Sequence, residues 1–222
     1  MSNRTLPLLI IAVLAAAGGL WAARGLFGPV TAAKTSTPLP AVSSVTLMST
    51  PRELPAFALQ QSDGTALTGE ELRGHWTVVF IGFTHCPDIC PTTLAELNGA
   101  QKQWAALPEA SRPRVLFVSA DPERDTPKIT GDYAHAFNAD SLAATAPLPQ
   151  LEAFTRSLSL VFMKVPNQSG PGASGAAADY TIDHSAALIV LDPQARMAGV
   201  ITPPFDPKAI AADLLALTKA TP

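Results

Sequence analysis

The hydrophobic pattern divides the chain into an apolar N-terminal segment and a long remainder in which short apolar runs alternate with amphipathic ones. Residues 5–23 contain no charged side chain and lie between Arg4 and Arg24. At ~1.5 Å per residue, a helix of that length nearly spans the ~30 Å hydrocarbon core of a bilayer. We therefore expect one transmembrane helix within a membrane anchor at residues 1–27. A cleaved signal peptide is the alternative, but no clear small-x-small cleavage site precedes Arg24.

The segment that follows has the composition of a linker. Residues 28–50 are rich in Pro, Ser, Thr and Ala, which is typical of a solvated, flexible tether. Residues 51–222 then provide about 170 positions, enough for one domain with a substantial core and too few for two. The expected organisation is an anchor, a tether and one folded domain.

Within that domain, strand-like and helix-like segments alternate from residue 54 onward. Short apolar runs predict buried strands, and helical periodicity behind capping residues predicts helices. The predicted strands are 57–60, 77–83, 114–121, 186–192 and 197–202, and the predicted helical segments are 70–74, 92–107, 126–137, 148–159 and 206–219. A further apolar stretch covers 160–165. Parallel crossovers followed by a terminal antiparallel hairpin imply a mixed central sheet flanked by helices, an α/β thioredoxin-like fold.

Charge and composition exclude some classes of protein. The formal net charge is only −3, and the 15 Lys and Arg residues form no dense cluster, so nothing indicates nucleic-acid binding. Twenty-one prolines and 15% charged residues describe a loop-rich globular chain with a membrane segment rather than a disordered one.

The two cysteines of the chain, Cys86 and Cys90, follow directly on the apolar strand 77–83. A dithiol that ends a strand and begins a helix favours metal or redox chemistry, because a helix N-terminus stabilises thiolate over thiol. If Cys90 lies in the first helical turn with Pro91, the two Cβ atoms are about 5–6 Å apart. The sulfurs then either clamp one metal ion or close a disulfide. A purely stabilising disulfide is the weaker interpretation, since so small a loop removes little chain entropy.

A third candidate ligand is His184, which we place at the opening of the strand 186–192, where a loop-strand junction brings it toward the dithiol. The other histidines are interpreted differently. His75 and His135 are taken as surface or hydrogen-bonded structural residues. His85 adjoins Cys86, and its role is left open: it is a candidate to tune the thiolate without binding the metal, since in an extended segment its side chain points away from that cysteine.

This donor set suits copper. Two thiolates satisfy Cu(I), and an added imidazole gives an S₂N set that also holds Cu(II). Zinc is the main competitor, but a structural zinc site uses four protein ligands and the chain offers three. The open fourth position suits a carrier that must exchange its ion.

Three motifs, FIGFTHCPDICPTTLAEL, VSADPERDTP and YTIDHSAALIVLDP, occur in this order and resemble the Sco/SenC family of copper-binding proteins. The resemblance covers roughly residues 54–217. It implies that Cys86, Cys90 and His184 bind one copper ion per chain, as Cu(I) or Cu(II). Four residues are expected to surround these ligands and shape the site: Pro87, Asp88, Asp121 and Asp183. A glycine- and alanine-rich insertion at 167–178 departs from the compact pattern just ahead of His184.

The resemblance also implies a function and a location. The expected protein is a copper metallochaperone, without catalytic turnover, that delivers copper during cytochrome c oxidase assembly. The implied partners are the copper-site subunit of the oxidase, an upstream periplasmic copper donor and a thioredoxin-like reductant. The expected location is the bacterial inner membrane, with one membrane pass and the soluble domain in the periplasm.

Two other activities are weighed against copper delivery. A membrane-tethered thiol–disulfide oxidoreductase would reduce the cysteines of an oxidase copper site with Cys86 or Cys90 as the attacking thiolate, and it would not need His184. A thiol peroxidase is the weaker alternative, because only the analogy of fold supports it.

Overall fold

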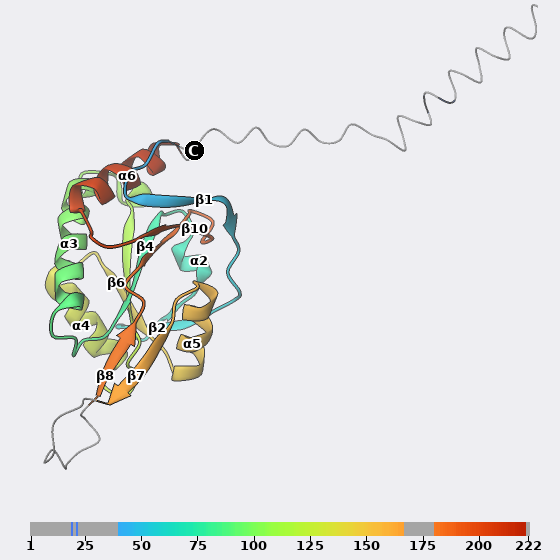
Figure 1. Cartoon of the computed structure of the whole chain (residues 1–222). Helices are drawn as coiled ribbons and strands as arrows, with labels where there is room; N and C mark the ends of the chain where they lie inside the picture. Colours follow the sequence, from blue (N-terminus) through green and yellow to red (C-terminus); the bar gives the residue numbers. More distant parts are fainter. Residues whose placement is uncertain (1–18, 20, 22–39, 167–179, 221–222) are drawn as a thin grey trace, which may run out of the picture. The chain divides into compact units, whose positions relative to one another are not determined.

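The computed structural model describes residues 19, 21, 40–166 and 180–220 (Figure 1). Three predicted segments lie outside these residues: the anchor apart from residues 19 and 21, the tether up to residue 39, and the insertion at 167–178. In the part of the chain that is described, no helix is long and apolar enough to cross a membrane.

The centre of the domain is an eight-stranded mixed sheet with the strand order β1-β10-β9-β4-β5-β6-β2-β3. Its strands are β1 (Val45–Arg52), β2 (Leu59–Gln61), β3 (Ala66–Leu67), β4 (Thr77–Gly82), β5 (Arg114–Ser119), β6 (Leu142–Thr145), β9 (Leu188–Leu191) and β10 (Met197–Ile201). β5 runs parallel to β4 and β6, whereas all other neighbours are antiparallel. The predicted mixed sheet and the β9–β10 hairpin are confirmed.

The central strands β4 and β5 explain the apolar runs of the sequence. Every residue of β4 is buried, as are five of the six residues of β5, because helices cover both faces of the sheet. Their parallel register pairs Gly82 with Ser119 at the carboxyl ends. Both strands therefore deliver their following loops to the same edge of the sheet.

Five helices pack on this sheet: α2 (Gly69–Leu72), α3 (Ile89–Trp104), α4 (Pro127–Phe137), α5 (Leu148–Ser157) and α6 (Pro207–Ala220). Helices α3, α4 and α6 lie on one face, and α2 and α5 on the other (Figure 1). The predicted helix at 126–137 is confirmed as α4, which is capped by Thr126: its hydroxyl accepts a hydrogen bond from the N–H of Ile129, and Pro127 follows at the first position. A 3₁₀ turn (Glu109–Ser111) links α3 to β5.

The folded domain begins earlier than the sequence predicted. β1 takes up Val45–Arg52, which lies largely within the expected tether at 28–50. Its pairing with β10, close to the far end of the chain, makes this an ordered strand. The composition of 28–50 indicates only a solvated segment, so it does not reveal a partner more than a hundred residues away. The short strand β6 was likewise not predicted, since its four residues carry no clear pattern.

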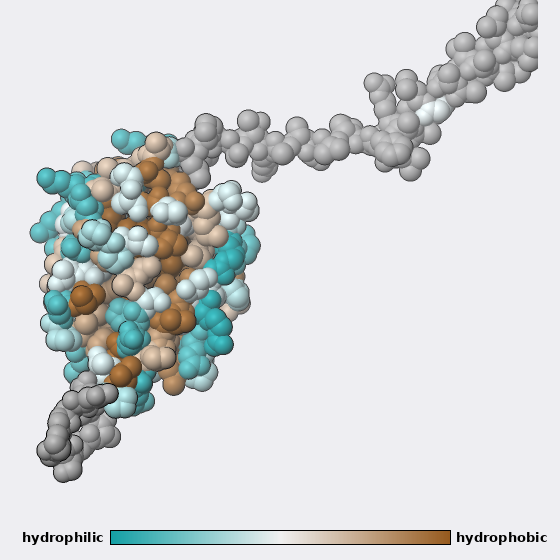
Figure 2. Space-filling view, in the orientation of Figure 1, coloured by the Kyte–Doolittle hydropathy of each residue, from teal (hydrophilic) through white to brown (hydrophobic). Residues whose placement is uncertain are grey.

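A second, two-stranded antiparallel sheet joins β7 (Phe162–Pro166) to β8 (Tyr180–His184). The apolar stretch predicted at 160–165 is thus mostly a strand. The placement of His184 at the opening of the strand 186–192 is wrong: His184 is the last residue of β8, and β9 begins only at Leu188. Figure 2 shows apolar side chains among polar ones at the lower end of the domain, where Figure 1 places this hairpin.

Candidate metal centre

The dithiol lies where β4 passes into α3. The helix begins at Ile89, three residues before the predicted start, so Cys90 occupies its first turn and the missing N–H of Pro91 costs no helical hydrogen bond. The Asp88 side chain forms no cap. The sulfur of Cys86 takes that role instead, accepting a hydrogen bond from the N–H of Cys90 at 3.3 Å. The expected approach of the two cysteines is therefore present.

The two thiols differ in environment, and neither is in a disulfide. Cys86 is partly exposed, whereas Cys90 is fully buried. Burial raises the pKa of the Cys90 thiol far above its ordinary value, and the nearby Cys86 and Asp125 raise it further. Without a metal, Cys90 is thus a neutral thiol at pH 7, and burial outweighs the helix N-terminus that favours thiolate at this position.

His184 reaches the dithiol from β8. Its Nε2 atom lies 3.7 Å from the Sγ of Cys90, while its Nδ1 atom lies 3.1 Å from the carbonyl oxygen of Ser185. A carbonyl oxygen only accepts hydrogen bonds, so Nδ1 carries the proton and Nε2 turns its lone pair toward the sulfur. The rings of Phe80 and Phe83 contact the imidazole edge-on at centroid distances of 6.1 and 6.2 Å. These contacts fix the plane of the ring.

A groove of about 520 Å³ opens beside the dithiol, between the first turns of α3, the end of β8 and residues 203–205. Its apolar lining includes Phe83, Ile89, Ile182, Pro203, Pro204 and Phe205. Three of the four residues expected to surround the ligands, Pro87, Asp88 and Asp183, also line it. A partner molecule that enters this groove meets Cys86 and His184 directly.

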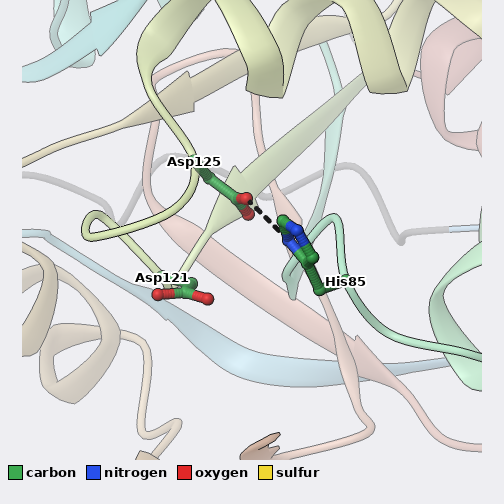
Figure 3. Close-up of side chains that lie close together, drawn as sticks. All are labelled: His85, Asp121 and Asp125. Carbon is green, nitrogen blue, oxygen red and sulfur yellow. Dashed lines mark ion pairs between the residues drawn. The ribbon is translucent and has the colours of Figure 1, made fainter. Parts of the chain in front are cut away.

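The fourth expected residue, Asp121, is buried and lies near a second buried carboxylate, Asp125 (Figure 3). Asp125 accepts hydrogen bonds from the N–H of Thr84 at 2.8 Å, the Thr84 hydroxyl at 2.6 Å and the Ser119 hydroxyl at 2.5 Å. It thereby holds the chain two residues before Cys86. Asp121 instead pairs with Arg124 and accepts a hydrogen bond from the hydroxyl of Tyr180. The DPERDTP motif therefore bonds both to the loop ahead of Cys86 and to the strand that ends in His184.

His85 turns toward these carboxylates, with its Nδ1 atom 3.5 Å from Asp125 Oδ1 (Figure 3). His85, Asp121 and Asp125 lie close enough together to hold an ion, but both carboxylates already have protein donors. The cluster thus fixes the loop that carries Cys86. His75 and His135 bond to backbone carbonyl oxygens at 2.9 and 3.0 Å, which agrees with their interpretation as structural residues.

Sequence reasoning missed one residue that contacts this network. Tyr180 starts the strand that ends in His184, and its only signal in the sequence is its place in the motif YTIDH. It is nearly buried and bonded to Asp121, which links the histidine strand to the DPERDTP loop.

Comparison with known proteins places the chain among relatives of known fold. A family model described as SCO1/SenC matches residues 46–219. A protein of Stutzerimonas stutzeri named "Putative copper-binding protein" is 31% identical over 165 residues, which cover 73% of this chain and 76% of that protein. The mitochondrial SCO1 homolog 1 of Arabidopsis thaliana is 33% identical over 140 residues, 62% of this chain but only 39% of that longer protein.

The fold itself matches solved structures. The structure of Bradyrhizobium japonicum ScoI with copper bound superposes with a TM-score of 0.64 at 30% identity, covering 74% of this chain and 98% of that one. The thioredoxin-like arrangement of a mixed sheet with flanking helices is thereby confirmed.

Proposed function

Because this chain belongs to the SCO1/SenC family, we propose that it binds copper and delivers it during the assembly of cytochrome c oxidase. The observation that carries the proposal is the approach of His184 Nε2 to within 3.7 Å of Cys90 Sγ, beside a second free thiol. The imidazole nitrogen of His184 thus meets the sulfur of Cys90 from a distant part of the chain, and the sulfur of Cys86 lies beside the backbone N–H of Cys90.

These three residues form the proposed binding site for one copper ion per chain. Cys86 and Cys90 supply the soft thiolates that Cu(I) prefers, and the imidazole of His184 completes a set that also suits Cu(II). Binding requires Cys90 to lose its proton, so copper uptake releases protons. Three protein ligands leave a position open for an incoming ligand from a partner.

The groove beside the site supports transfer to and from other proteins. Its apolar lining, including Ile89 with 55% of its surface exposed, gives a partner a contact area next to Cys86 and His184. The proposed partners are an upstream copper donor and the copper-site subunit of the oxidase, with a thioredoxin-like reductant that keeps the dithiol reduced.

For the location, we propose the periplasmic side of a bacterial inner membrane. The uncharged segment 5–23 would anchor the chain, and the part of the predicted tether at 28–50 that precedes the folded domain would give the domain reach. Fractionation of cells tests this proposal. Recovery of a chain that begins near Arg24, entirely in the soluble fraction, would contradict the anchor.

The test of copper binding is the copper content and visible absorption of the reduced protein, compared with the His184→Ala variant. The wild type should bind one equivalent of Cu(II) with a sulfur-to-copper absorption band, and His184→Ala should change that band. His135→Ala is the matched control, because the ring of His135 bonds to the carbonyl of Ser141 on another part of the domain. A Cu(II) spectrum unaffected by His184→Ala would make His85 the next histidine to examine.

A second candidate function, reduction of the cysteines of an oxidase copper site, is favoured by one observation. Cys86 is partly exposed on the groove, within reach of a partner's disulfide, and its sulfur accepts a hydrogen bond from the N–H of Cys90 at the start of α3. Reduction of a disulfide-bonded peptide by the dithiol separates the two functions. A reductase retains its rate in His184→Ala, whereas a copper carrier loses Cu(II) binding.

A further inference from the structure

The β7–β8 hairpin, which carries His184, is attached to the rest of the domain at few points. Within residues 40–166 and 180–220, its polar links to other elements are made by Tyr180, by Lys164 and by His184 itself. The bonds between Ser185 and Val161, at 2.9 and 3.0 Å, join only the two sides of the hairpin to each other. Apart from the contacts of His184 itself and the burial of Ile182, the hairpin is held by what binds the far end of β8.

At that far end, Tyr180 contacts Asp121, Arg124 and Lys164. Its hydroxyl donates to Asp121 Oδ1 at 2.6 Å, and its carbonyl oxygen accepts a hydrogen bond from Arg124 Nη1 at 3.1 Å. The guanidinium of Arg124 and the ammonium of Lys164 each lie 3.8 Å from the centroid of its ring. Two cations at that distance do not fit on one face, so the ring lies between them. Cation–π contacts of this kind are strongest where water is excluded.

Arg124 and Lys164 do not contribute equally to holding Tyr180. Arg124 is largely buried and pairs with Asp121, which is 2% exposed. Lys164 and its partner Glu123 are 44% and 61% exposed, and ion pairs this exposed contribute little. Arg124 and Asp121 thus hold the tyrosine, and Lys164 adds a weaker contact from the partner strand.

Strand β8 couples the position of Tyr180 to the position of His184. Residues Tyr180, Ile182 and His184 alternate along β8 and share the face that packs on the domain, as their burial indicates. The two ends of the strand are about 13 Å apart at ~3.3 Å per residue. Pairing with β7 from Pro166 to Phe162 keeps the strand straight, so a shift at Tyr180 moves His184.

The loop that holds Tyr180 also holds the dithiol. The Ser119 hydroxyl donates to Asp125, which fixes Thr84 ahead of Cys86, and accepts a hydrogen bond from the N–H of Asp121 at 3.1 Å. One short segment, 119–125, therefore bonds both to the loop that carries Cys86 and to the strand that carries His184.

We propose that Tyr180, held by Asp121 and Arg124, is a positioning residue that keeps His184 within reach of the dithiol and so sets how tightly Cu(II) is bound. The proposal rests on the proposed copper site. Tyr180→Phe keeps the ring and removes the hydrogen bond to Asp121. We expect Cu(II) affinity to fall on the order of tenfold, in line with the loss of one hydrogen bond to a carboxylate. Cu(I) affinity should change far less, because the two thiolates suffice for Cu(I).

The experiment measures Cu(I) and Cu(II) affinities and the nitrogen couplings of bound Cu(II) for wild type, Tyr180→Phe, His184→Ala and the double variant. If Tyr180 acts through His184, Tyr180→Phe weakens the nitrogen coupling in the wild-type background and has no effect on Cu(II) affinity in the His184→Ala background. Equal losses for both oxidation states, or an unchanged Cu(II) signal in Tyr180→Phe, would overturn the positioning role. Absence of nitrogen coupling in the wild type would instead overturn the proposed copper site.

Lys164→Met keeps the proposal testable if Tyr180→Phe does not fold. Its side chain is partly exposed, and it should lower Cu(II) affinity in the same direction by a smaller factor. Lys128→Met is the matched control, since Lys128 forms an exposed ion pair with Asp132 within α4. Identical Cu(II) affinities for the two lysine variants would count against the role of the Tyr180 ring.

Discussion

Gly82 leaves the space that the sulfur of Cys90 occupies. A Cβ atom built on Gly82 would lie 2.9 Å from Cys90 Sγ and 3.0 Å from Cε2 of Phe117. Both distances are shorter than ordinary van der Waals contacts. The last residue of β4 must therefore be glycine for the buried thiol to take its place in the first turn of α3.

This contact predicts the effect of Gly82→Ala. The added methyl group must displace the sulfur or the ring, which should lower the free energy of unfolding by about 1–3 kcal/mol. The displaced sulfur should also weaken Cu(I) binding. Gly69→Ala is the control, because its nearest neighbours would be 3.9 Å away. Chemical denaturation and a copper competition assay measure both effects, and wild-type copper affinity in Gly82→Ala would contradict the close packing.

The two thiols should react at different rates. Cys86 is partly exposed, whereas Cys90 is buried and burial raises the pKa of its thiol, so at pH 7 it is protonated. Iodoacetamide should therefore label Cys90→Ser, which retains Cys86, at least about tenfold faster than Cys86→Ser. The rate for Cys90 should rise with pH, since only the thiolate reacts. Equal labelling rates at pH 7 would show that Cys90 is more accessible than its burial indicates.

Copper and oxidation should compete for the dithiol. A disulfide between Cys86 and Cys90 removes both thiolate donors, so the oxidised protein should not bind Cu(I). By linkage, bound Cu(I) should stabilise the reduced form and shift the midpoint potential of the pair to more positive values. A redox titration that follows free thiols with and without Cu(I) measures the shift. An unchanged midpoint would place the metal elsewhere.

The carboxyl of Asp213 binds residues at the start of the folded domain, and it should make the free energy of unfolding depend on pH. Burial alone would raise the pKa of this carboxyl, but hydrogen bonds from Ser44, Ser43 and Val45 lower it below its ordinary value. A lowered pKa in the folded state gives stability that is present above the pKa of the unfolded chain and is lost as pH falls through the folded value. Asp213→Asn should thus cost about 1–3 kcal/mol at pH 7.

The cost of Asp213→Asn should begin to shrink as the pH falls below about 4, where the carboxyl of the unfolded chain becomes protonated, and should vanish only below the lowered pKa of the folded protein. Urea unfolding of both proteins between pH 7 and pH 3 measures this difference. Asp63→Asn provides a control, since Asp63 is also a hydrogen-bonded carboxylate but lies in an exposed turn. A cost that stays constant with pH would exclude the carboxylate charge as its origin.

Local features of the sequence determined much of the fold. The apolar runs at β4 and β5, the helix at 126–137 and the terminal antiparallel hairpin were all predicted, because each depends on residues that are near one another in the sequence. The same holds for the two cysteines at a strand–helix junction, whose approach follows from their separation by only four residues where the loop enters α3.

The tertiary structure alone decided which distant residues meet. His184 lies 94 residues beyond Cys90, and its approach depends on the β7–β8 hairpin and on Tyr180, neither of which the local pattern predicted. β1 is ordered by a strand at the other end of the chain, and burial, not helix position, sets the protonation of Cys90. Periodicity records whether a residue is buried, but not against which residue, because contacts between distant segments form only when the whole core closes around them.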